Sequence, residues 1–216
     1  MAILSRIESD LINLKAELLQ INKKINVSIH VVDLVQPDET KEAFNVIKSI
    51  YDTSIKSLVC FAGSWIKSKP LADLEIADFL EGLESNFFCT FNAIKEVVRI
   101  CEPELKGLSI ITIGGSSGVW MNPEAPVMSV AKGAIRHLSR VIAKQLLLKE
   151  VHVAHIIIDG PILNERGKYL NATLQEKDFI KLDSVASEIH HVINQSPDAW
   201  TFEWDIRPWT WNTKLI

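Results

Sequence analysis

A glycine- and serine-rich segment between a strand and a long helix is the part of this sequence best suited to chemistry. The β-branched run at residues 109–113 predicts a buried parallel strand, and the Gly-Gly-Ser-Ser-Gly loop of residues 114–118 follows it directly. The apolar pattern after Val127 predicts a helix that carries Lys132 near its start. In open α/β sheets, ligands bind where the carboxyl end of a strand leads through a loop into a helix. We therefore expect any chemistry to be located here.

Strands and helices are predicted to alternate along the whole chain, with no internal repeat and no linker. This order is typical of a doubly wound, mostly parallel α/β sheet with right-handed crossovers, formed by a single domain over residues 1–216. The predicted strands are 2–5, 27–32, 58–61, 109–113, 151–158 and 201–206. The predicted helices are 7–19, 39–51, 74–83, 85–100, 127–149 and 183–194, and residues 163–181 are expected to form a partly helical flap.

Composition and charge argue against several classes of partner. Lys and Arg number 23 against 27 Asp and Glu, and this net charge of −4 argues against a nucleic-acid partner or an anionic membrane. No apolar run approaches the roughly 18 residues of a membrane span. Cys60, Cys89 and Cys101 are odd in number and lack metal-ligand spacing, so we expect buried free thiols, no metal site and a cytoplasmic location.

Short motifs in the first third of the chain resemble the short-chain dehydrogenase/reductase family. Arg6 ends a segment similar to that family's second strand, where an arginine favours NADP. Asp33 matches the acid after the third strand that holds the adenine amino group. Ala62 and Gly63 stand in the second half of the family's Asn-Asn-Ala-Gly motif. The resemblance implies that these four residues bind NADP or NAD.

The resemblance continues to the carboxyl end of the chain and supplies catalytic candidates. Asn86 falls where the family has its catalytic asparagine, and Lys132 where it has the lysine of the YxxxK motif. Gly160 and Ile162 stand in the segment that lines the nicotinamide, and Asn164 takes the position of its threonine. The tryptophan-rich residues 195–209 resemble one divergent subgroup. By resemblance, the chain is a Rossmann-like, NAD(P)-dependent oxidoreductase of carbonyl or alcohol substrates.

Three departures from the family pattern predict impaired activity. The glycine-rich turn of the first β-α unit, which grips the pyrophosphate at a helix amino terminus, is absent, and we interpret the chain as amino-terminally truncated. The residue four before Lys132 is Met128 instead of tyrosine, and a thioether has no proton to donate. The family's serine position falls on Gly115, with Ser116 one residue further on.

Each candidate site residue also has an ordinary structural role as an alternative. Lys132 could be an ordinary solvated lysine instead of a ligand to a ribose hydroxyl, and Asn86 could be a helix cap instead of the anchor for a water molecule. Ser116 could replace the missing hydroxyl, although serine in a glycine loop is usually part of a turn. Asp33 could cap the next turn instead of contacting adenine.

Two functional hypotheses follow. The first is an oxidoreductase of a small carbonyl or alcohol substrate that the sequence does not identify. The second, favoured for actual activity, is a catalytically silent pseudoenzyme that serves as a binding or oligomer subunit. In either case the resemblance implies a homodimer or homotetramer formed through the helices predicted at 85–100 and 127–149. Loss of the family's first strand would leave unpaired backbone groups in the core. Either the remaining strands close the gap in another order, or the sequence is a truncated version of a longer protein, which is the interpretation we favour.

Overall fold

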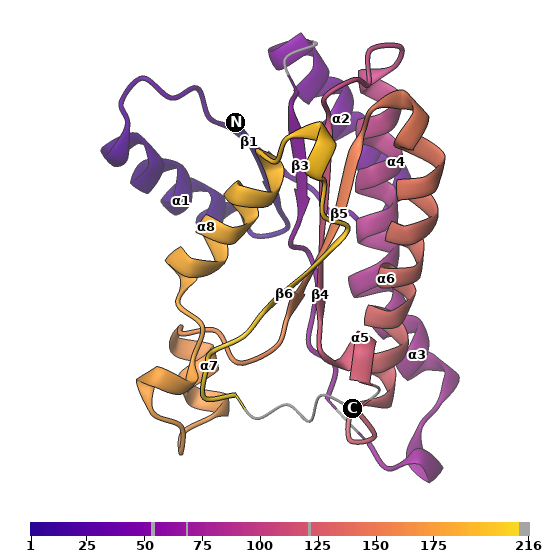
Figure 1. The fold of residues 1–216 in the computed structure, drawn as a ribbon, viewed down its shortest axis with the longest axis vertical. Coiled ribbons are helices and arrows are strands. Elements are labelled where there is room, and N and C mark those ends of the chain that lie inside the picture. The colour runs from indigo at the N-terminus through magenta and orange to yellow at the C-terminus, as the bar shows by residue number, and fades with distance from the viewer. Residues whose placement is uncertain (53–54, 68, 121, 212–216) are drawn as a thin grey trace.

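Parallel strands and helices alternate along the chain and form an α/β structure (Figure 1). The computed structural model describes residues 1–52, 55–67, 69–120 and 122–211. The strands are β1 (Ala2–Ser5), β2 (Ser28–Val31), β3 (Ser57–Cys60), β4 (Ser109–Gly115), β5 (His152–Ile158) and β6 (Glu203–Ile206). The α-helices are α1 (Glu8–Ile21), α2 (Pro37–Tyr51), α3 (Ile76–Gly82), α4 (Cys89–Cys101), α5 (Ser117–Trp120), α6 (Pro126–Leu146), α7 (Glu165–Leu170) and α8 (Leu182–Ile193). Short helical turns cover Leu71–Asp73, Leu147–Lys149, Glu176–Asp178 and Pro197–Ala199.

The strands form two parallel sheets instead of one. Strand β1 pairs with β2, and a second sheet has the order β3-β4-β5-β6. Helices α2, α4 and α6 lie on one side and α1 and α8 on the other, which confirms the doubly wound α/β prediction (Figure 1). The remaining strands do not close the expected gap, because β1 and β3 belong to separate sheets.

The core is divided by the four-stranded sheet. On one side, Ile110 and Val153 pack with the apolar faces of α4 and α6, and on the other Ile111 and Ile156 pack against α8. Strands β4 and β5 are buried on both faces, and for this reason their sequences are nearly continuous apolar runs. These two buried strands therefore fix the positions of the loops that follow their carboxyl ends.

One long helical stretch differs from the prediction. The sequence suggested two helices separated near residue 84, but α3 and α4 are joined by a π-helical segment, Leu83–Phe88, without a break. The π segment contains wider turns, and such turns often occur at functional sites. It includes Asn86, which is buried.

The tryptophans near the carboxyl end take separate partners instead of packing on one another. Trp200 stacks on His152 with ring centroids 4.9 Å apart, and the indole of Trp204 donates a hydrogen bond to Glu188. Trp211 donates to Asp159, whereas Trp209 is 86% exposed. Within the described residues, no helix is both long enough and apolar enough to cross a bilayer.

A buried polar network ties β4 to β5 and α6. The hydroxyl of Thr112 lies 2.8 Å from Nδ1 of His155 and 2.7 Å from the hydroxyl of Ser139, which also donates to the carbonyl of Ile135. All three side chains of the network are almost completely buried. Burial lowers the pKa of His155 from 6.5 to about 4. The native protein therefore holds His155 neutral at a pH where the unfolded chain binds a proton.

This network predicts a specific pH dependence of stability. Because the folded pKa of His155 lies below the unfolded value, its contribution is present above pH 6.5 and is lost as the pH falls towards 4. The loss in the free energy of unfolding reaches up to about 3 kcal/mol. Urea denaturation at several pH values checks this: His155→Gln should flatten the acid slope, and the exposed control His190→Gln should not. Identical slopes for wild type and His155→Gln would contradict it.

Candidate functional site

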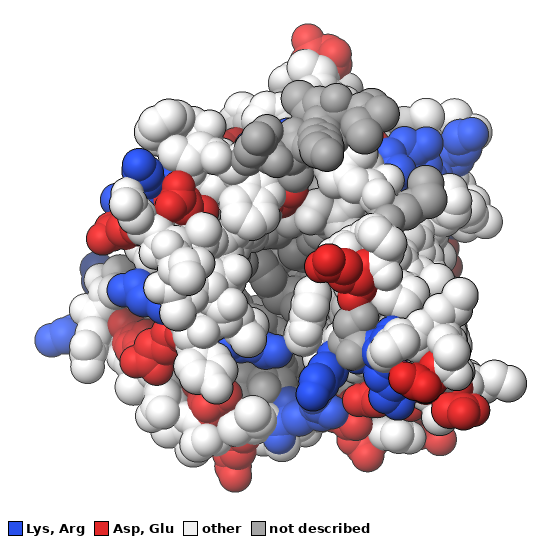
Figure 2. All heavy atoms as spheres, turned by 90° about the horizontal axis from the view of Figure 1, so that it is seen from below, with Lys and Arg blue, Asp and Glu red and all other residues white. Residues whose placement is uncertain are grey.

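The candidate site lies at the carboxyl ends of β3 and β4, where the chain leaves the sheet for the π segment and for α6. Figure 2 shows this end of the molecule, with acidic and basic side chains interspersed and the surface hollowed near its centre. The direction of the strands places the loops after β3, β4 and β5 on this one side (Figure 1). Side chains far apart in the sequence can therefore meet here.

Asn86 is held rigidly, yet one of its polar atoms has no partner. Its side-chain nitrogen donates to the carbonyls of Ser64 at 3.0 Å and Gly82 at 3.1 Å, and it lies 3.1 Å from the hydroxyl of Ser85. Its Oδ1 is buried and accepts no hydrogen bond within the described part of the chain. An unsatisfied buried acceptor costs about 1–3 kcal/mol, and such an atom calls for an explanation such as a missing ligand or water.

Gly63 and Lys132 adjoin that unsatisfied oxygen. A Cβ atom added to Gly63 would lie 2.6 Å from Oδ1 of Asn86 and 3.6 Å from Nζ of Lys132. The Lys132 ammonium donates to the carbonyl of Ile113 at 3.4 Å. Burial lowers its pKa, an effect that the nearby Cys89 thiol opposes. The structure thus brings together three predicted residues: Gly63, Asn86 and Lys132.

A close backbone approach fixes where Lys132 sits. A Cβ atom on Gly118 would lie 2.7 Å from the carbonyl carbon of Lys132 and 2.9 Å from its Cβ. Only a residue without a side chain lets the short helix α5 rest on α6 at this point. The glycine of the Gly-Gly-Ser-Ser-Gly loop therefore positions the lysine by packing.

Cys89 is a member of this cluster that the sequence interpretation treated only as a buried thiol. Its Sγ lies 3.2 Å from the carbonyl of Ser85 and 3.3 Å from that of Asn86, and 3.8 Å from that of Ala62. Burial raises the pKa of the Cys89 thiol, so it stays protonated at neutral pH. Its spacing of three residues from Asn86 on a helix was the signal that could have placed it here.

Ser116 and Met128 take structural positions. The carbonyl of Ser116 accepts hydrogen bonds from the amides of Val119 and Trp120, which starts α5. Met128 is buried in an apolar cluster with Ile66 and Val127. Met128 precedes Lys132 by one helical turn, so the two positions share a face of α6.

The predicted adenine-side residues lie on the smaller sheet. Arg6 follows β1 and is exposed. Asp33 follows β2, and its Oδ1 accepts a hydrogen bond from the amide of Val35 at 3.0 Å, which is the turn-capping role considered as its alternative. Asn92 on α4 donates to the carbonyl of Leu34 at 2.8 Å. This bond ties the Asp33 turn to the helix that follows the π segment.

The loop after β5 contains the remaining predicted cofactor residues. Gly160 adopts φ +150°, and Ile162 forms an isolated parallel bridge with Ile180. Asn164 is exposed, and its side chain caps α7 by accepting a hydrogen bond from the amide of Gly167 at 2.7 Å. None of these residues shares a hydrogen bond with Asn86 or Lys132 in the described structure.

Asp159 is a buried carboxylate in the same loop that sequence reasoning did not single out. Its Oδ1 accepts a hydrogen bond from the indole of Trp211 at 3.2 Å, and its Oδ2 lies 3.7 Å from the guanidinium of Arg207. Its partners Trp211 and Arg207 are distant in the sequence and meet Asp159 only in the folded chain.

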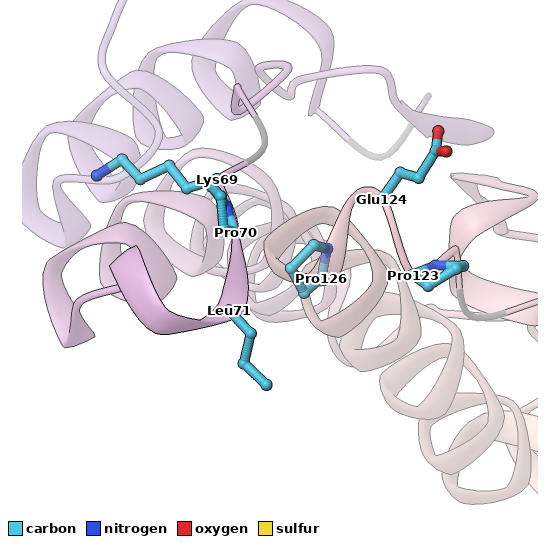
Figure 3. Close-up of a pocket in the computed structure, with 6 residues that line it drawn as sticks. All are labelled: Lys69, Pro70, Leu71, Pro123, Glu124 and Pro126. Carbon is cyan, nitrogen blue, oxygen red and sulfur yellow. The ribbon is translucent and has the colours of Figure 1, made fainter.

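A pocket of about 460 Å³ lies between two of the carboxyl-end loops (Figure 3). Lys69, Pro70 and Leu71 line one side, and Pro123, Glu124 and Pro126 the other. The charged ends of Lys69 and Glu124 point away from its centre, which leaves three proline rings as its walls (Figure 3). None of the site candidates above lines this pocket, so it is a separate feature of the same end of the molecule.

The fold and this polar cluster define an α/β protein with a candidate ligand site at the carboxyl edge of a parallel sheet. Residues 4–190 match a family model described as enoyl-(acyl carrier protein) reductase. No curated protein matches the sequence. With this match over most of its length, and with the structural relatives described next, the chain belongs to the short-chain dehydrogenase/reductase family.

Solved structures share the fold at low sequence identity. A short-chain dehydrogenase from Rhodopseudomonas palustris is 21% identical with a TM-score of 0.76, covering 96% of this chain and 86% of that chain. L-sorbose reductase from Gluconobacter frateurii, complexed with NADPH and L-sorbose, is 15% identical with a TM-score of 0.84, covering 98% and 87%. A short-chain oxidoreductase from Pseudomonas aeruginosa PAO1, described as containing an atypical catalytic centre, has the same four values.

The crowding around Gly63 predicts a position-specific loss of stability. In Gly63→Ala the new methyl group must displace the Asn86 side chain and break its hydrogen bonds, at a cost of about 1–3 kcal/mol. Gly115→Ala is the matched control, because its nearest atom, the carbonyl oxygen of Ile158, would be 3.7 Å away. Urea denaturation measures both. Equal stability of the two variants would mean that Asn86 moves without cost.

Proposed function

We propose that this chain is an NADP- or NAD-binding oxidoreductase of the short-chain dehydrogenase type, acting on a small carbonyl or alcohol with impaired proton transfer. The unpartnered Oδ1 of Asn86 next to the Lys132 ammonium is the observation that carries this proposal. An acceptor and a cation beside an exposed glycine fit the hydroxyl groups of a ribose. Bound NAD(P) would supply the hydride chemistry, and the protein orients it.

Each residue of the site has a defined part in this proposal. The Lys132 ammonium donates to ribose hydroxyls, and the Asn86 Oδ1 accepts from a hydroxyl or from a held water molecule. Ala62 and Gly63 leave room for the ligand, and Ser116 is the candidate hydroxyl for the substrate carbonyl. Arg6, Asp33, Gly160, Ile162 and Asn164 complete the cofactor contacts that the family resemblance implies.

Impairment follows from the chemistry at Met128. A general acid contributes roughly 10²–10⁴-fold to the rate, and a thioether has no proton to give. In the described residues before Gly63, no glycine-rich turn follows a strand, so this part of the chain offers no backbone cradle for a pyrophosphate at a helix amino terminus. The structural neighbour from Pseudomonas aeruginosa, described as containing an atypical catalytic centre, is a precedent for a changed catalytic centre on this fold.

Cofactor binding predicts a thermal shift that depends on Lys132. Free NADPH or NADH at 100 times the dissociation constant should stabilise the protein by about 2.7 kcal/mol. Lys132→Met removes a charge-assisted hydrogen bond worth about 1.5–3 kcal/mol, so affinity should fall by about 10–100-fold. Without ligand this variant should be at least as stable as wild type, since burial disfavours the ammonium.

Lys144→Met is the control, because Lys144 lies exposed on the same helix. Fluorescence titration and thermal melting with both cofactors give the measurement. Absence of saturable binding in the wild type would remove the oxidoreductase proposal. Equal affinity of the two variants would remove Lys132 from it.

The missing proton donor predicts a gain of activity. Met128→Tyr places a phenol one turn before Lys132 on the same helix face and should raise NADPH-dependent reduction of a ketone panel by about 10²-fold or more. Met128→Phe is the matched control, because it adds similar bulk to the cluster with Ile66 and Val127 but no hydroxyl. Cofactor oxidation is followed by absorbance. Equal rates for the two variants would show that a phenol alone does not complete the site.

A second candidate function is that of a non-catalytic oligomer subunit, a pseudoenzyme. It is favoured by aromatic side chains on the helix that runs from the π segment into α4: Phe87 stacks on Phe91 at 6.5 Å and contacts Phe88 at 5.4 Å, while Phe88 and Phe91 are about 40% exposed. Val130 and Val141 are exposed on α6. A homodimer or homotetramer through these helices, in the cytoplasm, accommodates both candidates.

A further inference from the structure

The side-chain nitrogen of Lys132 is held at the candidate site without a counter-ion. Among the described residues, no carboxylate oxygen lies within ion-pair distance of it. Its hydrogen bond to the carbonyl of Ile113 is 3.4 Å long, beyond the usual range for an N–H donor. A charged group taken out of water is normally paired, because burial alone disfavours the charge. The protonated form of this lysine therefore receives little support from its surroundings.

The acidic side chains on the elements around Lys132 either have other partners or are exposed. Asp78 pairs with Lys69, Glu203 with Arg136 and Arg140, and Asp159 with Arg207, whereas Glu81 and Glu84 are exposed. Two further titratable groups act on Lys132, the thiol of Cys89 and the imidazole of His155. Burial keeps both of these groups uncharged at neutral pH. Lys132 thus faces a neutral environment.

This environment favours the neutral amine of Lys132. Burial lowers its pKa from the ordinary value of 10.5, and the Cys89 thiol opposes this effect only in part. At neutral pH a larger fraction of Lys132 is therefore unprotonated than of a lysine in water. A lysine desolvated in this way is the usual source of an amine nucleophile in proteins. The side chain is only half-buried, so a small molecule can reach it.

An unused acceptor lies on the same side of the cluster. The Cβ position of Gly63 is 3.6 Å from Nζ of Lys132 and 2.6 Å from the unpartnered Oδ1 of Asn86. Because Gly63 has no side chain, no atom of it separates the amine from this oxygen. A hydroxyl group formed next to the lysine nitrogen would satisfy Oδ1, which otherwise costs stability.

We propose that Lys132 captures small aldehydes and ketones as a Schiff base, in a reaction that needs no nicotinamide cofactor. The amine nitrogen forms a bond to the carbonyl carbon while the C=O electron pair moves to oxygen. Transfer of one proton from nitrogen to oxygen then gives a carbinolamine, whose hydroxyl donates to Oδ1 of Asn86. That hydroxyl leaves as water with the remaining amine proton, and a C=N bond is left. Nothing is oxidised or reduced.

Reductive trapping tests the capture on the intact protein. Wild type is incubated at neutral pH with methyl ethyl ketone and sodium cyanoborohydride, and each lysine-containing peptide is quantified by mass spectrometry. Lys132 should be alkylated at least about tenfold faster than Lys144, which is exposed on the same helix, since each unit by which a pKa falls raises the amine fraction about tenfold. The rate at Lys132 should reach its plateau at a pH below 10.5.

Met128 provides a matched pair of variants one helical turn before Lys132. Met128→Glu places a carboxylate where it pairs with the lysine, since glutamate four residues before lysine is the favourable order on a helix. The pair holds the lysine as an ammonium, so trapping at Lys132 should fall at least about tenfold relative to Met128→Gln, which has the same shape without the charge. Circular dichroism should be the same for the two variants.

Three results would overturn the proposal. These are trapping at Lys132 no faster than at Lys144, equal trapping in the two Met128 variants with intact folds, or a rate at Lys132 that is still rising above pH 10.5. The first and third need only the wild-type protein.

NADPH added to the same reaction scores the proposed function separately. The ribose hydroxyls take the ammonium of Lys132 and the carbonyl compound takes its amine, so bound cofactor should slow the trapping. Fast trapping that NADPH leaves unchanged would support the capture and remove Lys132 from the cofactor site. Slow trapping together with saturable NADPH binding would do the reverse.

Discussion

Pairing of backbone groups along β4 and β5 is the constraint on which the rest of the structure depends. These strands pair over seven residues from Ser109–His152 to Gly115–Ile158, and nearly all their side chains are buried on both faces. A buried amide or carbonyl without a partner costs about 1–3 kcal/mol, so a ladder of this length tolerates no shift in register. It therefore fixes the carbonyl of Ile113, which receives the Lys132 ammonium, and it aligns Thr112 with His155.

The same constraint explains why the polar cluster at Asn86 is informative. Buried polar side chains such as Thr112, Ser139 and Thr40 are satisfied by neighbours, whereas Nδ1 of His152 and Oδ2 of Asp159 share with Oδ1 of Asn86 the lack of a hydrogen-bond partner among the described residues. Asn86 uses its amide nitrogen fully but leaves Oδ1 open beside Lys132, whose own charge is disfavoured by burial. The π segment and a close contact of Gly118 hold the unpaired Oδ1 of Asn86 next to the buried Lys132 ammonium, and both groups lower the stability of the folded state. Such costs persist at sites that bind something.

Much of this arrangement could be predicted from the sequence, because it depends on local patterns. The β-branched runs gave the strands of the doubly wound sheet, and the Gly-Gly-Ser-Ser-Gly loop gave the position of Lys132. Cys89 and Asp159 were missed as site neighbours because their partners, Lys132 and Trp211, are tens of residues away. The π segment was also missed, since a wide turn leaves the apolar pattern of Ile76–Cys101 almost unchanged.

The division into two sheets could not be read from any motif, because it is a property of hydrogen-bond partners and not of residue types. Strand β1 is an ordinary apolar strand in sequence, and its pairing with β2 is satisfied on one side only. Helices tolerate this arrangement because α2 and α4 pack through side chains, which need no register with the strands beneath them. A strand edge has no such tolerance: its free amides must find water or another backbone. The helical layer thus holds the two sheets at their places while the strand layer stays open, because side-chain packing needs no shared register whereas backbone pairing does.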